Sequence, residues 1–175
     1  MRIAATVVAL ALATLVGATA AIAGPPRCAV GSLRAWSAHS GGGGTIFQEY
    51  GFVNVGRQTC VMRGFSAVMM LDNSGRSMPT TVRRSDAPGY GPVQLVTLRE
   101  GERAWFVASY ADGTRYRLDR CPTSARLRLT PPADRHGVVL RGPHGRITPY
   151  GGTFHHLHCG IVTAGPLHLF SGASY

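Results

Sequence analysis

The chain has 175 residues, 18 basic and 8 acidic side chains, and a formal net charge of +10 at pH 7. This length allows a sizeable core, and the absence of repeats, linkers and coiled-coil periodicity argues against several domains or a repeat array. Every basic residue is arginine, which a GC-rich coding sequence explains as well as selection for an anionic partner does.

The first 23 residues have the composition of a secretory signal peptide helix, with a basic start and an apolar, alanine-rich stretch. Small residues at 21–23 place the cleavage before Gly24, or alternatively after Ala20. An uncleaved anchor is the alternative, because roughly 20 apolar residues can span a bilayer, but the segment lacks a basic stop-transfer flank. We expect a secreted or cell-envelope protein, with residues 24–175 as one domain and no transmembrane span after cleavage.

The pattern of the mature chain predicts a succession of short β-strands. Segments of alternating or β-branched character are separated by Gly, Pro, Asp and Asn, which is typical of an antiparallel sandwich or barrel. We expect strands at 32–38, 46–55, 67–71, 94–98, 104–111, 125–130, 138–141 and 167–170. In the sixth of these, Leu127 and Leu129 alternate with Arg126 and Arg128, so the leucines should face the core.

Two connections between strands are also predicted. The stretch from Val96 to Ala108 is predicted to be a β-hairpin that turns at 99–101. The glycines from Gly41 to Gly44 are predicted to be a flexible connection between the first two strands. No Gly-Lys-Ser/Thr follows them, so a phosphate-binding loop is disfavoured.

The four cysteines, Cys28, Cys60, Cys121 and Cys159, all lie in the exported part of the chain. An oxidising compartment favours disulfides. Four cysteines allow three pairings, and their spacing alone does not choose among them. Cys28 follows Pro-Pro-Arg rather than a box of small residues, so no lipid anchor is expected.

An ordered set of landmarks runs along almost the whole mature chain. They are Cys28 and Leu33; NVGRQTCVMRGF from Asn54 to Phe65; LDNSG ending at Gly75; Val96, Leu98, Gly101 and Ala104; Cys121-Pro122 with Leu127, Thr130, Pro131 and Pro132; Cys159-Gly160; and Pro166-Leu167. On these residues the chain resembles the actinobacterial exported proteins and lipoproteins catalogued as domain of unknown function 4232. The segment from His136 to His158 is longer and richer in histidine than the resemblance implies.

The resemblance implies an all-β fold, an immunoglobulin-like antiparallel β-sandwich with two disulfides and no established activity. It pairs Cys28 with Cys60 and Cys121 with Cys159, and it supplies no catalytic residues. Each bridge would close a loop that the chain-entropy model associates with roughly 3 to 4 kcal/mol. The role expected for the cysteines is therefore architectural.

Three histidines and a cysteine cluster in FHHLHCG, residues 154–160. In an extended conformation His156 and His158 would share the face opposite Cys159, which gives two candidate ligands for zinc or copper. A third ligand would be needed, such as His168 or His144. Because a thiolate ligand at Cys159 would leave another cysteine unpaired, we expect a disulfide there, no metal and no cofactor, with metal binding by residues 155–158 as the alternative.

Catalysis is disfavoured by the available motifs. The stretch from Gly64 to Val68 lacks the last glycine and the strand-turn-helix context of a nucleophile elbow around Ser66. The acids sit in turn-like or solvated contexts and form no carboxylate pair at a telling spacing. We expect that the protein is not an enzyme.

Two pairs of alternating arginines are the anion-binding candidates. Arg115 with Arg117, and Arg126 with Arg128, each project from one side of a strand, although a solvated outer face explains the same pattern. Aromatic residues are not interleaved with them, so no nucleic acid is expected as a partner. The sequence predicts an exported module that binds, or associates structurally, at the cell envelope or outside the cell, with anionic envelope polymers or another exported protein as partner.

Overall fold

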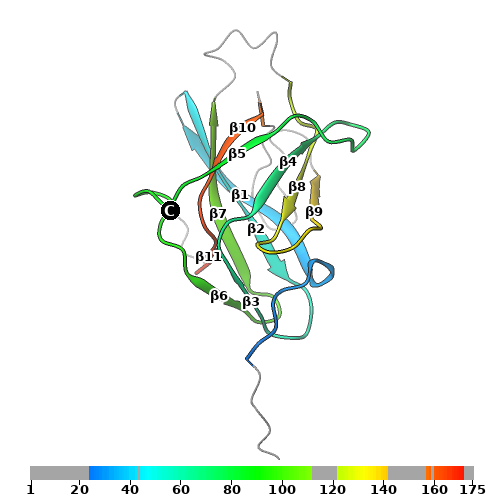
Figure 1. Cartoon of the computed structure of the whole chain (residues 1–175), viewed down its shortest axis with the longest axis vertical. Helices are drawn as coiled ribbons and strands as arrows, with labels where there is room; N and C mark the ends of the chain where they lie inside the picture. The colour runs from blue at the N-terminus through cyan, green and yellow to red at the C-terminus, as the bar shows by residue number, and fades with distance from the viewer. Residues whose placement is uncertain (1–23, 43, 112–121, 142–156, 159, 172–175) are drawn as a thin grey trace, which may run out of the picture.

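The computed structural model (Figure 1) describes residues 24–42, 44–111, 122–141, 157–158 and 160–171. Almost all regular structure in these ranges is β-strand, together with the single short 3-10 turn η1 (Val30–Ser32). No helix within them is long and apolar enough to cross a membrane. The predicted signal peptide, residues 1–23, lies outside the described residues.

Three sheets account for the strands. The large sheet contains β1 (Leu33–Gly42), β2 (Thr45–Asn54), β7 (Arg103–Ala111), β10 (Ile161–Ala164) and β5 (Thr81–Arg84) in that order, and β11 (His168–Leu169) also pairs with β7. One small sheet contains β3 (Cys60–Arg63) and β6 (Leu95–Leu98). The other contains β4 (Ala67–Leu71), β8 (Arg126–Thr130) and β9 (Val138–Arg141) in that order.

The core lies between the large sheet and the two small sheets. All three sheets contribute large, fully buried side chains to this core: Tyr50, Phe52 and Phe106; Leu98; and Met70, Leu127 and Leu129. The alternation predicted for β8 is confirmed, because its two leucines are fully buried and the arginines between them are only half-buried. The all-β class predicted from the sequence is therefore confirmed.

The expectation of purely antiparallel pairing is wrong at one place. β10 pairs with β5 in parallel, with Ile161 opposite Thr81 and Ala164 opposite Arg84, whereas the other ladders between named strands are antiparallel. Parallel neighbours require a long crossover connection. The chain between β5 and β10 supplies it by passing through all three sheets.

The hairpin predicted between Val96 and Ala108 does not form. β6 pairs with β3, whereas β7 pairs with β2 along its whole length and with β10 and β11 on its other edge. Both edges of β7 are thus occupied, and the turn in which the Glu102 N–H donates to the Arg99 carbonyl (3.1 Å) carries the chain from one sheet to another. Asn54 holds this turn by accepting from the Gly101 N–H (2.7 Å) and donating from Nδ2 to the Leu98 carbonyl (3.0 Å).

The glycines after β1 also differ from expectation. Gly41 and Gly42 belong to β1 and pair with Phe47 and Ile46 of β2, so they extend the hairpin beyond the register shift between Ser37 and Ser40. Gly44 takes the positive φ of 94° that the tight turn requires, a conformation that glycine adopts without steric cost. The prediction of a connection at 41–44 is therefore wrong for Gly41 and Gly42, whereas Gly44 lies between the two strands as predicted.

Strand ends match the predictions closely for the strands that the sequence marks by alternation. β4 and β9 have the predicted bounds; β6, β7 and β8 differ from theirs by one residue at one end, and β2 differs by one residue at each end. The sequence does not predict β3, β5 and β10, and each of them pairs with a strand distant in the sequence.

Candidate functional site

The bridge between Cys28 and Cys60 is confirmed, with an S–S distance of 2.05 Å and a Cα–Cα distance of 4.8 Å. It fastens the start of the domain to β3. Beside it the Cys28 N–H donates to the Val61 carbonyl (3.0 Å), and the Val61 N–H donates to the Pro26 carbonyl (2.9 Å). The N-terminal segment is thus paired with one edge of β3. Cys121 and Cys159 lie outside the described residues.

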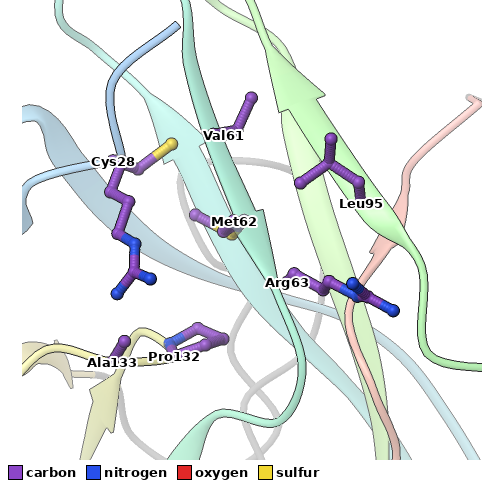
Figure 2. Close-up of a pocket in the computed structure, with 8 residues that line it drawn as sticks. Cys28, Val61, Met62, Arg63, Leu95, Pro132 and Ala133 are labelled. Atoms are coloured by element: carbon purple, nitrogen blue, oxygen red, sulfur yellow. The ribbon is translucent and has the colours of Figure 1, made fainter. Parts of the chain in front are cut away.

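A pocket of about 210 Å³ opens beside this bridge (Figure 2). Its lining consists of Arg27, Cys28, Val61, Met62, Arg63, Leu95, Pro132 and Ala133. These residues come from the N-terminal segment, β3, the start of β6 and the turn after β8, so only the tertiary structure brings them together. The volume is below the roughly 300 to 1,000 Å³ of ordinary small-molecule sites, so the pocket suits one side chain or small group rather than a large cofactor.

Alternation along β3 and β6 decides which side chains reach the pocket mouth. Met62 points into the core and is 5% exposed, whereas Arg63 is exposed on the opposite side of β3. Arg63 lies opposite Leu95 in the ladder, and Leu95 is 63% exposed. Because residues directly opposite on paired strands share a face, the exposed leucine stands next to the arginine, as Figure 2 shows.

The charged side chains that line the pocket are all positive. Arg27 and Arg63 are exposed, and neither has a carboxylate within ion-pair distance among the described residues. By contrast, Arg76 pairs with Asp72 at 3.2 Å within its own turn. Two cations beside an apolar pocket without a neutralising acid create a positive potential that favours an anionic ligand.

The rim of the pocket is a tight turn after β8. The Asp134 N–H donates to the Pro131 carbonyl (3.2 Å), and Ala133 has a φ of 61°, the left-handed region that a residue other than glycine rarely occupies. The Asp134 carboxylate accepts from the N–H groups of Arg135 (2.7 Å) and His136 (3.0 Å). The backbone N–H of Val30, in η1, also helps to lower the pKa of this carboxyl. The Asp134 carboxylate therefore stabilises this turn by accepting hydrogen bonds from backbone N–H groups.

Replacing Asp134 by asparagine is expected to weaken the fold near neutral pH. Hydrogen bonds from backbone N–H groups, foremost that of His136, lower the pKa of Asp134 in the folded protein. A carboxyl with a lowered folded-state pKa stabilises the fold above its unfolded pKa, about 3.9, and loses that contribution as the pH falls through the folded pKa. The melting temperature of Asp134→Asn should lie below that of the wild type at about pH 7, and the difference should shrink at about pH 3.

Thermal melts at several pH values measure this difference. Asp86→Asn is the matched control, because Asp86 is an exposed carboxylate for which no hydrogen bond is found among the described residues. A wild-type advantage that stays constant from neutral to acidic pH would contradict the assigned role of Asp134.

The histidine candidates do not assemble into a metal site within the described residues. His168 Nε2 donates to the Tyr90 carbonyl (2.8 Å) and Nδ1 lies 2.8 Å from Gln94 Nε2, so both ring nitrogens have a hydrogen-bond partner. His158 Nδ1 lies 3.0 Å from the Thr123 hydroxyl. No group of three or more candidate ligands occurs in the described ranges. His144 and His156 lie outside them, so a zinc or copper site at 155–158 stays a prediction.

The other candidates are also placed. Arg126 and Arg128 lie on the outward side of β8, as predicted, whereas Arg115 and Arg117 are outside the described residues. Ser66 is 1% exposed, so its hydroxyl is not accessible to a substrate in this structure. Sequence reasoning missed Arg27, Arg63 and Leu95 as a group, although an exposed Leu95 was implicit in the alternation with Val96 and Leu98.

Comparison with known proteins gives one match. A family model described as "Domain of unknown function (DUF4232)" matches residues 28–167. No curated protein and no solved structure matches the chain. The matched range contains the pocket lining from Cys28 to Ala133, and it begins one residue after Arg27.

Proposed function

The chain belongs to the DUF4232 family, and we propose that it is an exported binding module rather than an enzyme. It is an immunoglobulin-like β-sandwich with two disulfides, and it binds an anionic partner at the cell envelope or outside the cell. The partner is an envelope polymer or another exported protein.

Several features support the architecture and the export. The core between one large and two small sheets suits a sandwich. The apolar leader at 1–23 supports export. For the second bridge, Thr123 lies two residues after Cys121 and pairs with His158, the residue before Cys159. The Ser124 N–H also donates to the Leu157 carbonyl (3.0 Å), so the chain segments that lead to the two cysteines run side by side.

One observation carries the binding function. Arg27 and Arg63 line a small apolar pocket and lack an acidic partner among the described residues. A folded protein gains nothing in its own stability from cations left unpaired at an apolar pocket. A carboxylate or phosphate of a partner would form the charge-assisted hydrogen bonds that these guanidinium groups favour.

Binding of soluble polyanions tests the function. The mature protein, residues 24–175, should bind poly-glutamate and polyphosphate at about 50 mM salt and lose most of that binding at about 500 mM, where charges are screened over a few ångströms. Neutral dextran should not bind. Isothermal titration calorimetry measures all three. Absence of binding to both polyanions at low salt would overturn the proposal.

Two double variants with the same net charge distinguish the contribution of the pocket to binding from the contribution of the protein's overall positive charge. The double variant R27S/R63S should lower the affinity for poly-glutamate at least roughly fivefold, because it removes both cations from one site. R57S/R83S removes the same charge from two exposed arginines that do not line the pocket and should have a smaller effect. Equal losses in the two variants would show that binding depends on net charge alone.

A further inference from the structure

We propose that the pocket receives an extended acidic polypeptide that carries one apolar side chain and adds to the free edge of β3. This inference rests on the proposed function and deepens it. It names the partner's chemistry at the pocket: a carboxylate on each side of an apolar residue, presented by a chain in strand conformation.

The backbone of β3 supplies the first argument. The N-terminal segment pairs with β3 only at Val61, through the Cys28 N–H and the Pro26 carbonyl. The chain then turns away into η1. Since alternate residues of a strand present their N–H and C=O to the same edge, Arg63 is the next residue to face this edge, and no described backbone group pairs with it. An extended peptide can add its own hydrogen bonds to such an edge.

The shape and lining of the pocket supply the second argument. Next to the open edge, Val61, Leu95 and Pro132 form apolar walls around a volume of about 210 Å³, enough for one side chain. Leu95 is 63% exposed although its neighbour in the ladder is a long arginine side chain. A partner side chain that covers Leu95 would remove this apolar surface from water, which is favourable in proportion to the area buried.

The charges supply the third argument. Arg27 lies opposite Val61 on the N-terminal segment, and Arg63 follows Val61 by two residues on β3, so each of the two paired backbones brings one cation to the apolar pocket. The nearest acid in the rim, Asp134, is occupied by backbone N–H groups. The pattern of cation, apolar pocket and cation is complementary to an anion, an apolar residue and an anion in the partner.

The same lining argues against the other polyanions. No aromatic side chain lines the pocket on which a sugar ring could stack, and no side-chain amide or carboxylate is present to bind hydroxyl groups. A phosphate polymer would use the arginines but leave the exposed leucine in water.

Ala133 holds its strained left-handed conformation at this rim, and such strain is concentrated at ligand-binding positions.

Two capped hexapeptides test the inference. Glu-Asp-Leu-Val-Glu-Asp carries an apolar centre, and Glu-Asp-Ser-Ser-Glu-Asp carries the same charge without it. The Leu-Val peptide should bind the mature protein roughly tenfold more tightly or better, as expected from the burial of one leucine. It should also slow hydrogen exchange at the Arg63 N–H, which a purely electrostatic contact would leave unchanged.

Leu95→Ser should abolish this preference between the peptides, whereas Leu169→Ser should retain it. Leu169 is the matched control, since it is 47% exposed on β11 and does not line the pocket. Equal binding of the two peptides, or an unchanged preference in Leu95→Ser, would overturn the inference. Continued binding of polyphosphate would then leave the proposed function standing, whereas failure of both peptides and polyphosphate would remove both.

Discussion

Replacing both Cys28 and Cys60 by serine is expected to lower the free energy of unfolding by about 3 to 4 kcal/mol. The bridge spans a sequence separation of 32 residues, and its loss frees that loop in the unfolded chain. Net stabilities of single domains are about 5 to 15 kcal/mol. The double variant should therefore lose a large share of its stability and unfold at a clearly lower urea concentration than the wild type.

The variant also has a local effect at the pocket. Without the bridge, the segment that carries Arg27 is held to β3 by the two backbone hydrogen bonds at Val61. The same urea titrations in the presence of reductant provide the control, because wild type and double variant should then become nearly equal. Reductant should lower the stability of the double variant further if Cys121 and Cys159 form the second bridge that we propose. Equal stability of the two proteins without reductant would contradict the architectural role of Cys28 and Cys60.

Replacing Gly51 by alanine is expected to cost roughly 2 to 6 kcal/mol, as the sum of overpacking and the loss of a buried hydrogen bond. Gly51 lies opposite Trp36 in the pairing of β1 with β2. The indole of Trp36 crosses over Gly51 and donates from Nε1 to the Ala104 carbonyl at 3.1 Å. A Cβ on residue 51 would overlap that carbonyl oxygen and lie 2.7 Å from the indole nitrogen.

The substitution destabilises the fold because neither the Ala104 carbonyl nor the Trp36 indole can move away from an added Cβ. The Ala104 carbonyl belongs to β7 in the middle of the large sheet, and Trp36 is fully buried. Chemical denaturation of Gly51→Ala, with loss of the native fluorescence of Trp36 as a second signal, measures the effect. Gly31→Ala is the matched control, because a Cβ there meets no atom within 4 Å. Similar stabilities of the two variants would show that the crossing is not tightly packed.

The class of the fold and the faces of several strands could be predicted from the amino-acid pattern alone. In β8 the period-two pattern of leucine and arginine fixes which side chains enter the core, since successive residues of a strand point to opposite faces. The ordered cysteine, glycine and proline landmarks identified the family. The link between Cys28 and Cys60 followed from that resemblance, whereas spacing alone left three pairings open.

The pairing of the strands could not be predicted in this way, because it depends on contacts between distant parts of the chain. Buried and more exposed residues do alternate within 96–98 and 104–108, but the two strands do not pair with each other. β6 pairs with β3 and β7 pairs with β2, because pairing depends on the edges that distant strands leave open. The parallel pair of β5 and β10 likewise joins segments that are separated in the sequence by β6, β7, β8 and β9. The pocket depends on the same long-range pairing: Arg63 and Leu95 become neighbours only across the ladder of β3 and β6. A local pattern specifies the face of a strand, whereas its partner is specified by the rest of the chain.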